Sequence, residues 1–449
     1  MKTTELDVLK DPISKLFRGY AIPGIVASLS MCLYGIINGI ILGRFVGPNA
    51  LAAVNMASPI FNIISCLGIL IAIGGNTLTA ISLGEQNKRK ANHYFNNAFY
   101  TLLMITLAIF IMVVFFPHVL ARMVGANSVL FPMVVDYIRT FGIFVLPVIF
   151  NILLGISLQS IGKPQLYMIG NLLSVVLNII LDLILICVFD MGITGAALAS
   201  GISATVVFVL FFSKFIAKNS FLSVGRWKVD FKAIGRMIYN GSSEAITQFS
   251  GGFSFMIFNW ILISKFGEIG VSSFAVVQYI SLIVNAVIIG MSRGLGAISS
   301  VNYGAKQYSR ISELIAVAIK IVTSVGVVCT AILIIFKSPL ISLFVKDNLE
   351  VMNTSSEIIT FYSYNFIFVG ANIIINALYT AINNPRTSAI LAILRYVLLI
   401  GNFFILPLMF GNIGLWLSFV VAEIICVVVS YVCLNKTMQK WSINKLTAE

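Results

Sequence analysis

The sequence contains few charged residues. Asp, Glu, Lys and Arg together make up 10% of its 449 residues, whereas hydrophobic residues make up 59%. Soluble proteins carry about 25% charged residues. A soluble fold of this length cannot cover so much apolar surface, so the solvent around most of the chain must be lipid. The low charge content therefore excludes an ordinary soluble protein and predicts an integral membrane protein.

Histidine and cysteine are also scarce, and neither forms a metal-binding pattern. The two histidines, His93 and His118, belong to no HExxH-type motif, and the six cysteines fall inside apolar runs without a CxxC pair. We interpret the cysteines as small apolar side chains. There is also no Ser/His/Asp arrangement and no phosphate-binding glycine loop. The sequence therefore predicts neither an enzyme nor a cofactor.

Twelve apolar runs are long enough to cross a membrane as helices, and we expect an all-α fold of twelve transmembrane helices. Residues 11–20 combine apolar residues at helical spacing with Lys15 and Arg18, which predicts a surface helix before the first run. The runs lie at about 21–43, 51–82, 96–117, 131–159, 166–189, 193–216, 241–264, 271–301, 311–336, 353–382, 387–410 and 413–435.

The two halves of the chain resemble each other. Three landmarks recur at nearly constant offsets of 220, 221 and 219 residues: Gly84 and Gly304, Pro164 and Pro385, and Gly195 and Gly414. This spacing predicts two six-helix bundles related by a pseudo-two-fold repeat along the membrane normal. The expected organisation is an N-terminal bundle over 1–216 with a cation site, a basic linker over 217–240, and a C-terminal bundle over 241–449.

The net charge of +13 comes mostly from loops beside the apolar runs, so membrane topology explains it better than a nucleic-acid partner. The loops that share a side with the N-terminus hold most of the Lys and Arg residues. By the positive-inside rule, we expect both termini and the linker to face the cytoplasm. The lipid bilayer is the expected surrounding, and no nucleic acid is expected.

An acidic residue stands in the middle of the fifth run. Asp182 follows Asn178 by four residues, so both side chains project from one face of a helix. A carboxylate at membrane depth costs roughly 2.5–3.5 kcal/mol and persists only beside a partner or a water-filled cavity. One interpretation is an Asp held by neighbouring backbone donors. The other is a site for a proton or Na⁺, because hard cations prefer oxygen ligands.

Other polar residues at membrane depth are candidates for a substrate cavity. Glu244 precedes Gln248 by four residues, and it is either an acid that meets a cationic substrate or a helix-start carboxylate capped by Ser242. Glu423 is expected to have a structural pairing role, with Arg293 and Arg395 as candidate partners either of Glu423 or of Glu244. The remaining cavity candidates serve either as binding groups or as hydrogen bonds between helices; they are Gln278, Asn285, Asn372, Asn376 and Tyr379.

The stretch from Asn178 to Ser203, NIILDLILICVFDMGITGAALASGIS, resembles the fifth and sixth spans of multidrug and toxic compound extrusion (MATE) transporters. NGSSE at 240–244, the two post-helix glycines, and Pro164 and Pro385 fit the same family. The resemblance implies alternating access between two bundles. It also implies a site at Asp182 that binds Na⁺ or a proton, with Asn178, Ser200 and Asn38 around it. Many members carry an Asp where this chain has Asn38.

The function that this resemblance implies is a secondary active antiporter that exports organic cations in exchange for Na⁺ or H⁺. We also expect a bacterial cell membrane as the location and a monomer as the working form. The nearest alternative is a flippase for a lipid-linked saccharide, which is expected to have a more basic cavity than the scattered arginines here provide. An integral membrane enzyme is the third hypothesis, and it lacks a clustered catalytic set.

Overall fold

The chain is helical throughout the part that the computed structural model describes, residues 6–216, 221–345 and 348–446, and no strand occurs in these ranges. It divides into two compact units. The first unit comprises the residues up to Asp11 together with Val26–Ala245, and the second comprises Pro12–Ile25 and the residues from Ile246 onward. Two helices, α1 and α9, contribute residues to both units.

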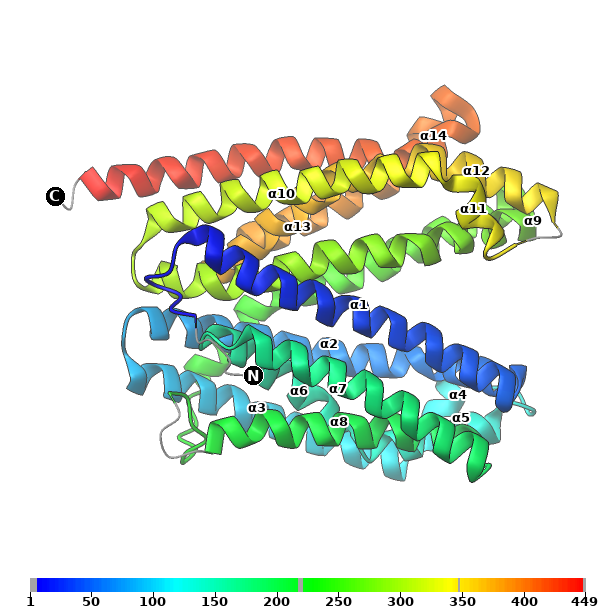
Figure 1. The fold of residues 1–449 in the computed structure, drawn as a ribbon, viewed down its shortest axis with the longest axis horizontal. Helices are drawn as coiled ribbons and strands as arrows, with labels where there is room; N and C mark the ends of the chain where they lie inside the picture. The colour runs from blue at the N-terminus through cyan, green and yellow to red at the C-terminus, as the bar shows by residue number, and fades with distance from the viewer. Residues whose placement is uncertain (1–5, 217–220, 346–347, 447–449) are drawn as a thin grey trace. The chain divides into compact units, whose positions relative to one another are not determined.

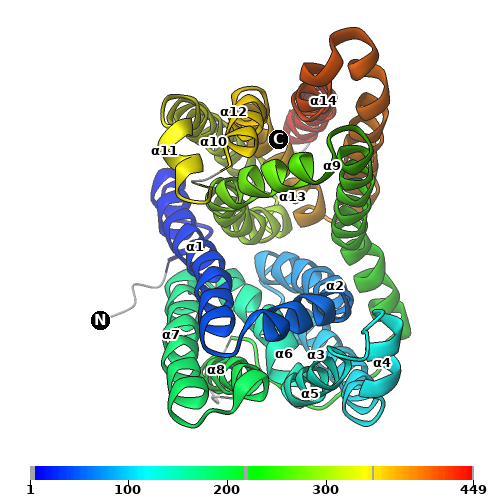
Figure 2. The same ribbon diagram turned by 90° about the vertical axis from the view of Figure 1, so that its right-hand side faces the viewer.

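The helices of the first unit pack against one another (Figure 1, Figure 2), and many aromatic side chains lie in their core. α2 lies against α3 and α6, and α8 lies against α6 and α7. Phe95 stacks on Phe215, and the ring of Phe99 meets Phe150 edge to face. Its elements are α1 Ile13–Phe45, α2 Pro48–Gly84, α3 Lys88–Phe115, α4 Pro117–Met123, α5 Phe131–Gly142, α6 Val145–Ser160, α7 Pro164–Asp182, the π-helix η1 Leu183–Val188, and α8 Gly192–Ile216.

The second unit has a comparable core. α13 packs against both α10 and α14, which run beside it in Figure 1. Phe258 lies at the centre, in ring contact with Phe274, Phe403 and Phe419. The elements are α9 Phe231–Gly304, α10 Tyr308–Ile335, α11 Lys337–Ser342, α12 Leu349–Tyr362, α13 Asn365–Ala381 and α14 Pro385–Leu446.

The backbone confirms the predicted repeat. Residues with a positive φ angle recur at offsets of 219–221 residues, in the pairs Gly47 and Gly267, Gln86 and Lys306, Gly162 and Asn383, and Gly192 and Gly411. The bent helix pairs recur too: α5 and α6 meet at 51°, and so do α12 and α13. The two halves thus share turn positions and bends, although most of the side chains differ.

The number of spans matches the prediction of twelve. Eight helices are long and apolar enough to cross a membrane, and each of the two bent pairs supplies one more. α9 and α14 are each two helices joined at a glycine, Gly267 with φ 59° and Gly411 with φ 58°. Glycine tolerates this left-handed backbone because it has no Cβ. Counted as halves, α9 and α14 complete the set of twelve within the described residues.

The predicted start of the first membrane-spanning helix, at about residue 21, is wrong. Residues 13–20 do not form a separate surface helix but the first turns of α1, which continues through Pro23 to Phe45. Leu16, Phe17 and Tyr20 are buried. The basic residues between them suggested a surface position, yet the apolar side chains all pack inward on one helical face.

The linker expected over 217–240 is shorter in the structure. α9 already begins at Phe231, and residues 217–220 lie outside the described ranges. Oδ1 of Asp230 accepts hydrogen bonds from the backbone N–H groups of Lys232 and Ala233, which is the geometry of a helix N-cap. Ala233 and Met237 are buried on one face of the new helix. The basic residues in this interval favoured the prediction of a linker, so the helix N-cap and the buried helical face were not recognised from the sequence.

Candidate functional site

Asp182 is the last residue of α7, and the chain continues from it directly into the π-helix η1. Its side chain is fully buried, with an exposed fraction of 0%. A π-helical turn is wider than an α-helical one and is frequently found at functional sites. The carboxylate therefore lies where the regular helix geometry of this span ends.

Two side-chain amides donate hydrogen bonds to one oxygen of this carboxylate. Nδ2 of Asn38, on α1, lies 3.2 Å from Oδ2 of Asp182. With the amide of Asn178 oriented to satisfy both of its polar atoms, its Nδ2 donates to the same Oδ2 at 2.9 Å and its Oδ1 accepts from the hydroxyl of Ser200 at 3.2 Å. The structure thus brings together the four residues predicted for the cation site: Asp182, Asn178, Asn38 and Ser200.

The second oxygen of the carboxylate has no hydrogen-bond partner. Oδ1 of Asp182 is buried, and among the described residues it receives no donor. Within the same ranges Asp182 forms no ion pair. A buried carboxylate without a cationic partner is costly, because its charge has lost water and gained nothing in return.

Tyr34 is the site residue that sequence reasoning missed. Its hydroxyl shares a hydrogen bond of 2.8 Å with the hydroxyl of Ser200. Because Ser200 donates to Asn178, the hydroxyl of Tyr34 is the donor in this bond. The signal was present in the sequence, since Tyr34 precedes Asn38 by four residues and so shares its helical face. A chain of hydrogen bonds therefore leads from Tyr34 through Ser200 and Asn178 to Asp182.

The predicted substrate-cavity residues are divided between the units. Glu244 belongs to the first unit and Gln248 to the second, and both lie on α9. Glu244 is no helix-start carboxylate, because α9 begins well before it at Phe231 and the hydroxyl of Ser242 donates to the carbonyl of Tyr239. Gln278 and Asn285 lie half-buried on the second half of α9.

Three further cavity candidates are engaged in hydrogen bonds of the second unit. Nδ2 of Asn372 donates to Oε2 of Glu423 at 2.6 Å. Oδ1 of Asn376 accepts from the hydroxyl of Ser388 at 2.6 Å, and the hydroxyl of Tyr379 bonds to Thr437. All three lie on α13 and their partners on α14, which is the arrangement expected of polar side chains that join helices.

The structure identifies the partner of Glu423, which the sequence left open. Nε of Arg395 forms an ion pair with Oε1 of Glu423, and both residues lie on α14 on opposite sides of the break at Gly411. Glu423 is buried, whereas Arg395 is partly exposed. The pair therefore ties the two halves of α14 together.

Comparison with known proteins places this geometry in a family. The MatE family model matches residues 23–184 and again 245–404. The chain belongs to the MatE family. The two separate matches correspond to the two predicted repeats and confirm that each half is one copy of the MatE unit. The membership also confirms the predicted MATE resemblance and identifies the chain as a multi-pass membrane protein.

Relatives of this MatE protein include export proteins from staphylococci. The multidrug export protein MepA of Staphylococcus saprophyticus is 25% identical over 437 residues, which cover 96% of each chain. MepA of a Staphylococcus aureus strain is 25% identical over 420 residues, which cover 93% of this chain and 92% of the relative. Such relatives are transporters, in agreement with the expectation that this chain is no enzyme.

Solved structures share the fold of this MatE protein over almost its whole length. A multidrug resistance MATE family transporter in an outward-facing conformation matches with a TM-score of 0.91 and 20% identity, covering 98% of this chain and 99% of that one. A transporter of the MOP superfamily from Pyrococcus furiosus, described as having a binding pocket of reverse polarity, matches with the same score, identity and coverage. These likenesses confirm the predicted all-α membrane fold.

Proposed function

We propose that this MatE protein is a secondary active antiporter that exports organic cations in exchange for a coupling cation, and that Asp182 binds the coupling cation. The observation that carries the proposal is the buried carboxylate, which has one unpartnered oxygen and no cationic side chain beside it. Such a group requires a mobile positive charge when it is ionised. A proton or a metal cation supplies that charge when it binds Asp182, and it is released on the other side of the membrane.

The amide of Asn38 favours a proton as the coupling ion. Its Nδ2 donates an N–H group to Oδ2 of Asp182, and an N–H group repels a metal cation. Na⁺ needs several oxygen ligands, so the amide of Asn38 would have to rotate to receive it. A proton needs only the unpartnered Oδ1. We therefore propose H⁺ as the coupling ion, with Na⁺ as the alternative that the experiment below separates.

Binding at Asp182 is linked to helix movement through α1. Asn38 on α1 donates to the carboxylate of Asp182 on α7, and this bond is strong only while the carboxylate is charged. Neutralising Asp182 weakens the bond and releases this part of α1. Because α1 contributes residues to both units, its displacement reaches beyond the first unit. The cation and the substrate then compete through their different affinities for the two conformations.

The proposed substrates are organic cations and drugs, and the support for this class is the set of staphylococcal relatives named as multidrug export proteins. The membrane potential contributes about 2.3 kcal/mol per charge per 100 mV to inward cation movement. We propose a bacterial cell membrane as the location, both termini in the cytoplasm, and a monomer as the working form. Glu244, Gln248, Gln278, Asn285, Asn372, Asn376 and Tyr379 remain the proposed cavity residues.

The experiment is efflux of ethidium from vesicles that contain the purified protein, under a pH gradient and a Na⁺ gradient imposed separately. The wild type is expected to export the dye under the pH gradient. Asp182→Asn is expected to insert normally and to export no more dye than protein-free vesicles. Efflux that follows the Na⁺ gradient alone would assign the site to Na⁺ instead.

The matched control is Asp136→Asn, the same chemical change at an exposed position on α5. It is expected to behave as the wild type under both gradients. If Asp182→Asn exports as well as Asp136→Asn, the carboxylate is structural and the proposal fails. If the wild type moves no dye under either gradient, a substrate other than an organic cation becomes the better hypothesis, and the flippase alternative gains support.

A further inference from the structure

The segment that leads into α9 is held along α3 by a ladder of polar side chains. Oδ1 of Asn92 accepts from the backbone N–H of Ser223 at 2.8 Å, and Oδ1 of Asn96 accepts from that of Gly225 at 2.7 Å. The hydroxyl of Tyr100 donates to the carbonyl of Gly225 at 2.8 Å. The backbone of this segment is therefore held against α3 as part of the first unit.

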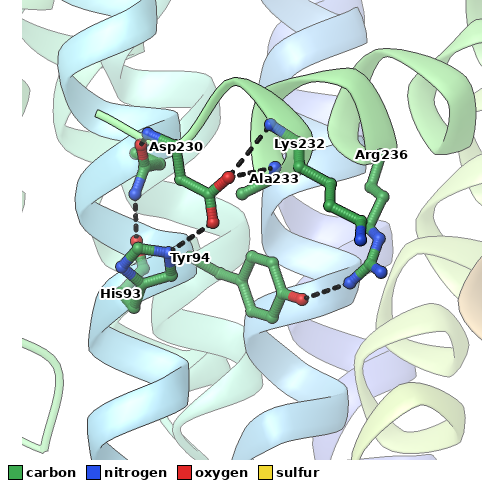
Figure 3. A network of polar contacts seen from close by, with 7 residues as sticks. His93, Tyr94, Asp230, Lys232, Ala233 and Arg236 are labelled. Atoms are coloured by element: carbon green, nitrogen blue, oxygen red, sulfur yellow. Dashed lines mark hydrogen bonds and ion pairs between the residues drawn. The ribbon is translucent and has the colours of Figure 1, made fainter. Parts of the chain in front are cut away.

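The ladder ends at Asp230, whose two carboxylate oxygens both take part in hydrogen bonds (Figure 3). Oδ1 accepts the N–H groups of Lys232 and Ala233, and Oδ2 lies 3.0 Å from Nε2 of His93. Asp230 is the acid nearest in sequence to Lys232 and Arg236, and its carboxylate forms hydrogen bonds with other groups. It does not form an ion pair with Lys232 or Arg236.

Lys232 and Arg236 lie side by side on the first turns of α9 in Figure 3. They are four residues apart, so they project from one helical face, and Nη1 of Arg236 donates to the hydroxyl of Tyr94 at 3.3 Å. In the described part of the chain neither residue forms an ion pair. Two like charges at this spacing repel each other unless an anion lies between them.

Large exposed apolar side chains lie on the same turns of α9 as this basic pair. Phe231 is 83% exposed, Tyr239 56% and Ile238 44%. The first half of α9, from Phe231 to the break at Gly267, is about 55 Å long at 1.5 Å per residue, whereas the hydrocarbon core is about 30 Å thick. At least one end of this half therefore projects beyond the hydrocarbon core, and the aromatic and basic residues of the first turns are of the kinds favoured in the headgroup layer.

We propose that Lys232 and Arg236 bind the phosphate of an anionic phospholipid headgroup, with Tyr94 holding Arg236 in position. The charge of the pair fits a phosphate, and Arg and Lys are the usual phosphate ligands. A lipid fits better than a soluble phosphate because Phe231, Ile238 and Tyr239 offer an apolar surface beside the pair, which a glycerolipid covers. The site is independent of ion coupling at Asp182, so it stands or fails separately from the transport function.

The test is native mass spectrometry of the full-length protein in detergent, with equal amounts of phosphatidylglycerol and phosphatidylcholine added. The wild type is expected to retain phosphatidylglycerol preferentially. Lys232→Gln with Arg236→Gln is expected to weaken that binding about 25-fold, since each basic residue near an anionic lipid contributes roughly fivefold. Tyr94→Phe keeps both charges and is expected to lose about threefold, the effect of one hydrogen bond.

The matched control is Lys436→Gln with Lys440→Gln, which removes two exposed cations at the same spacing on α14. It is expected to leave the preference unchanged. An equal loss in this control would show general charge attraction and overturn the site. Displacement of phosphatidylglycerol by millimolar inorganic phosphate would assign the basic pair to a soluble anion, and equal retention of phosphatidylcholine would remove the need for a headgroup charge; either result overturns the proposal.

Discussion

The side-chain amide of Asn38 on α1 donates a hydrogen bond of 3.2 Å to the carboxylate of Asp182 on α7. A hydrogen bond to a charged group contributes about 1.5–3 kcal/mol, more than a bond between neutral groups. The contact is therefore worth most when Asp182 is ionised and least when it carries a proton.

We expect Asn38→Ala to lower the thermal stability of the purified protein more at alkaline than at acidic pH. The difference should reach about 1 kcal/mol, since the bond to an ionised carboxylate is roughly twice as strong as a neutral one. Unfolding monitored by intrinsic fluorescence in detergent at several pH values measures it. Asn259→Ala, an exposed amide near the equivalent position of the second half, is the control and should show no such trend.

The ion pair between Arg395 and Glu423 predicts a second outcome. Removing one partner of a buried pair leaves an uncompensated charge and costs about 3–5 kcal/mol, whereas replacing both with apolar residues is often neutral. Glu423→Gln should therefore lower the stability strongly, although Asn372 still bonds to the new amide. Arg395→Met with Glu423→Met should recover most of the loss. A double variant less stable than either single variant would contradict this interpretation.

Two glycines of α9 should respond oppositely to the same substitution. A methyl group added at Gly241 would lie 1.8 Å from the carbonyl oxygen of Leu70 on α2, whereas one added at Gly235 meets nothing within 4 Å. Gly241→Ala should cost about 1–3 kcal/mol, the usual range for overpacking. Gly235→Ala should be neutral or stabilise the helix by up to about 1 kcal/mol. Thermal unfolding of both variants decides whether α2 and α9 pack this closely in solution.

The segment at 221–230 should loosen in acid. Hydrogen bonds from the backbone N–H of Ala233 and from His93 hold the pKa of Asp230 below its usual range. A lowered pKa stabilises the folded form fully above the unfolded-state pKa of about 3.9, and this stabilisation is lost as the pH falls through the lower folded-state value. Hydrogen exchange of residues 221–230, corrected for intrinsic rates, should be constant above about pH 5 and faster below about pH 4.

Asp230→Asn provides the control for this pH dependence. Asparagine caps a helix about as well as aspartate, so α9 should still begin at the same residue. The acid-dependent part of the exchange should disappear, because the new side chain does not titrate. The same acceleration below pH 4 in this variant would show that another group controls the segment.

Most of the architecture followed from the sequence because lipid restricts the possible folds. Spans, repeat and bundles are visible as long apolar runs at a constant offset. The group at Asp182 was predictable for a similar reason, since polar residues at membrane depth are few. The family resemblance added Ser200 and Asn38, which lie on other helices.

The remaining features depend on contacts that a single sequence does not record. Tyr34 is one aromatic residue among many, and only its position beside Ser200 distinguishes it. The π-helix after Asp182 has no sequence signal of its own. The partner of Glu423 could not be chosen between two arginines, because the choice depends on how α14 folds back at Gly411. The start of α9 was obscured because its capping residue lies inside a basic segment.

The repeated turns also bear on how the protein arose. Tandem duplication produces two equal copies, and here the turns still coincide at a nearly constant offset. At an offset of 220 residues, however, Asn402 stands where the first copy has Asp182, and its amide is satisfied by the carbonyl of Ser418. The two copies have therefore kept the same turns, whereas the position that holds a buried carboxylate in the first copy holds a neutral amide in the second.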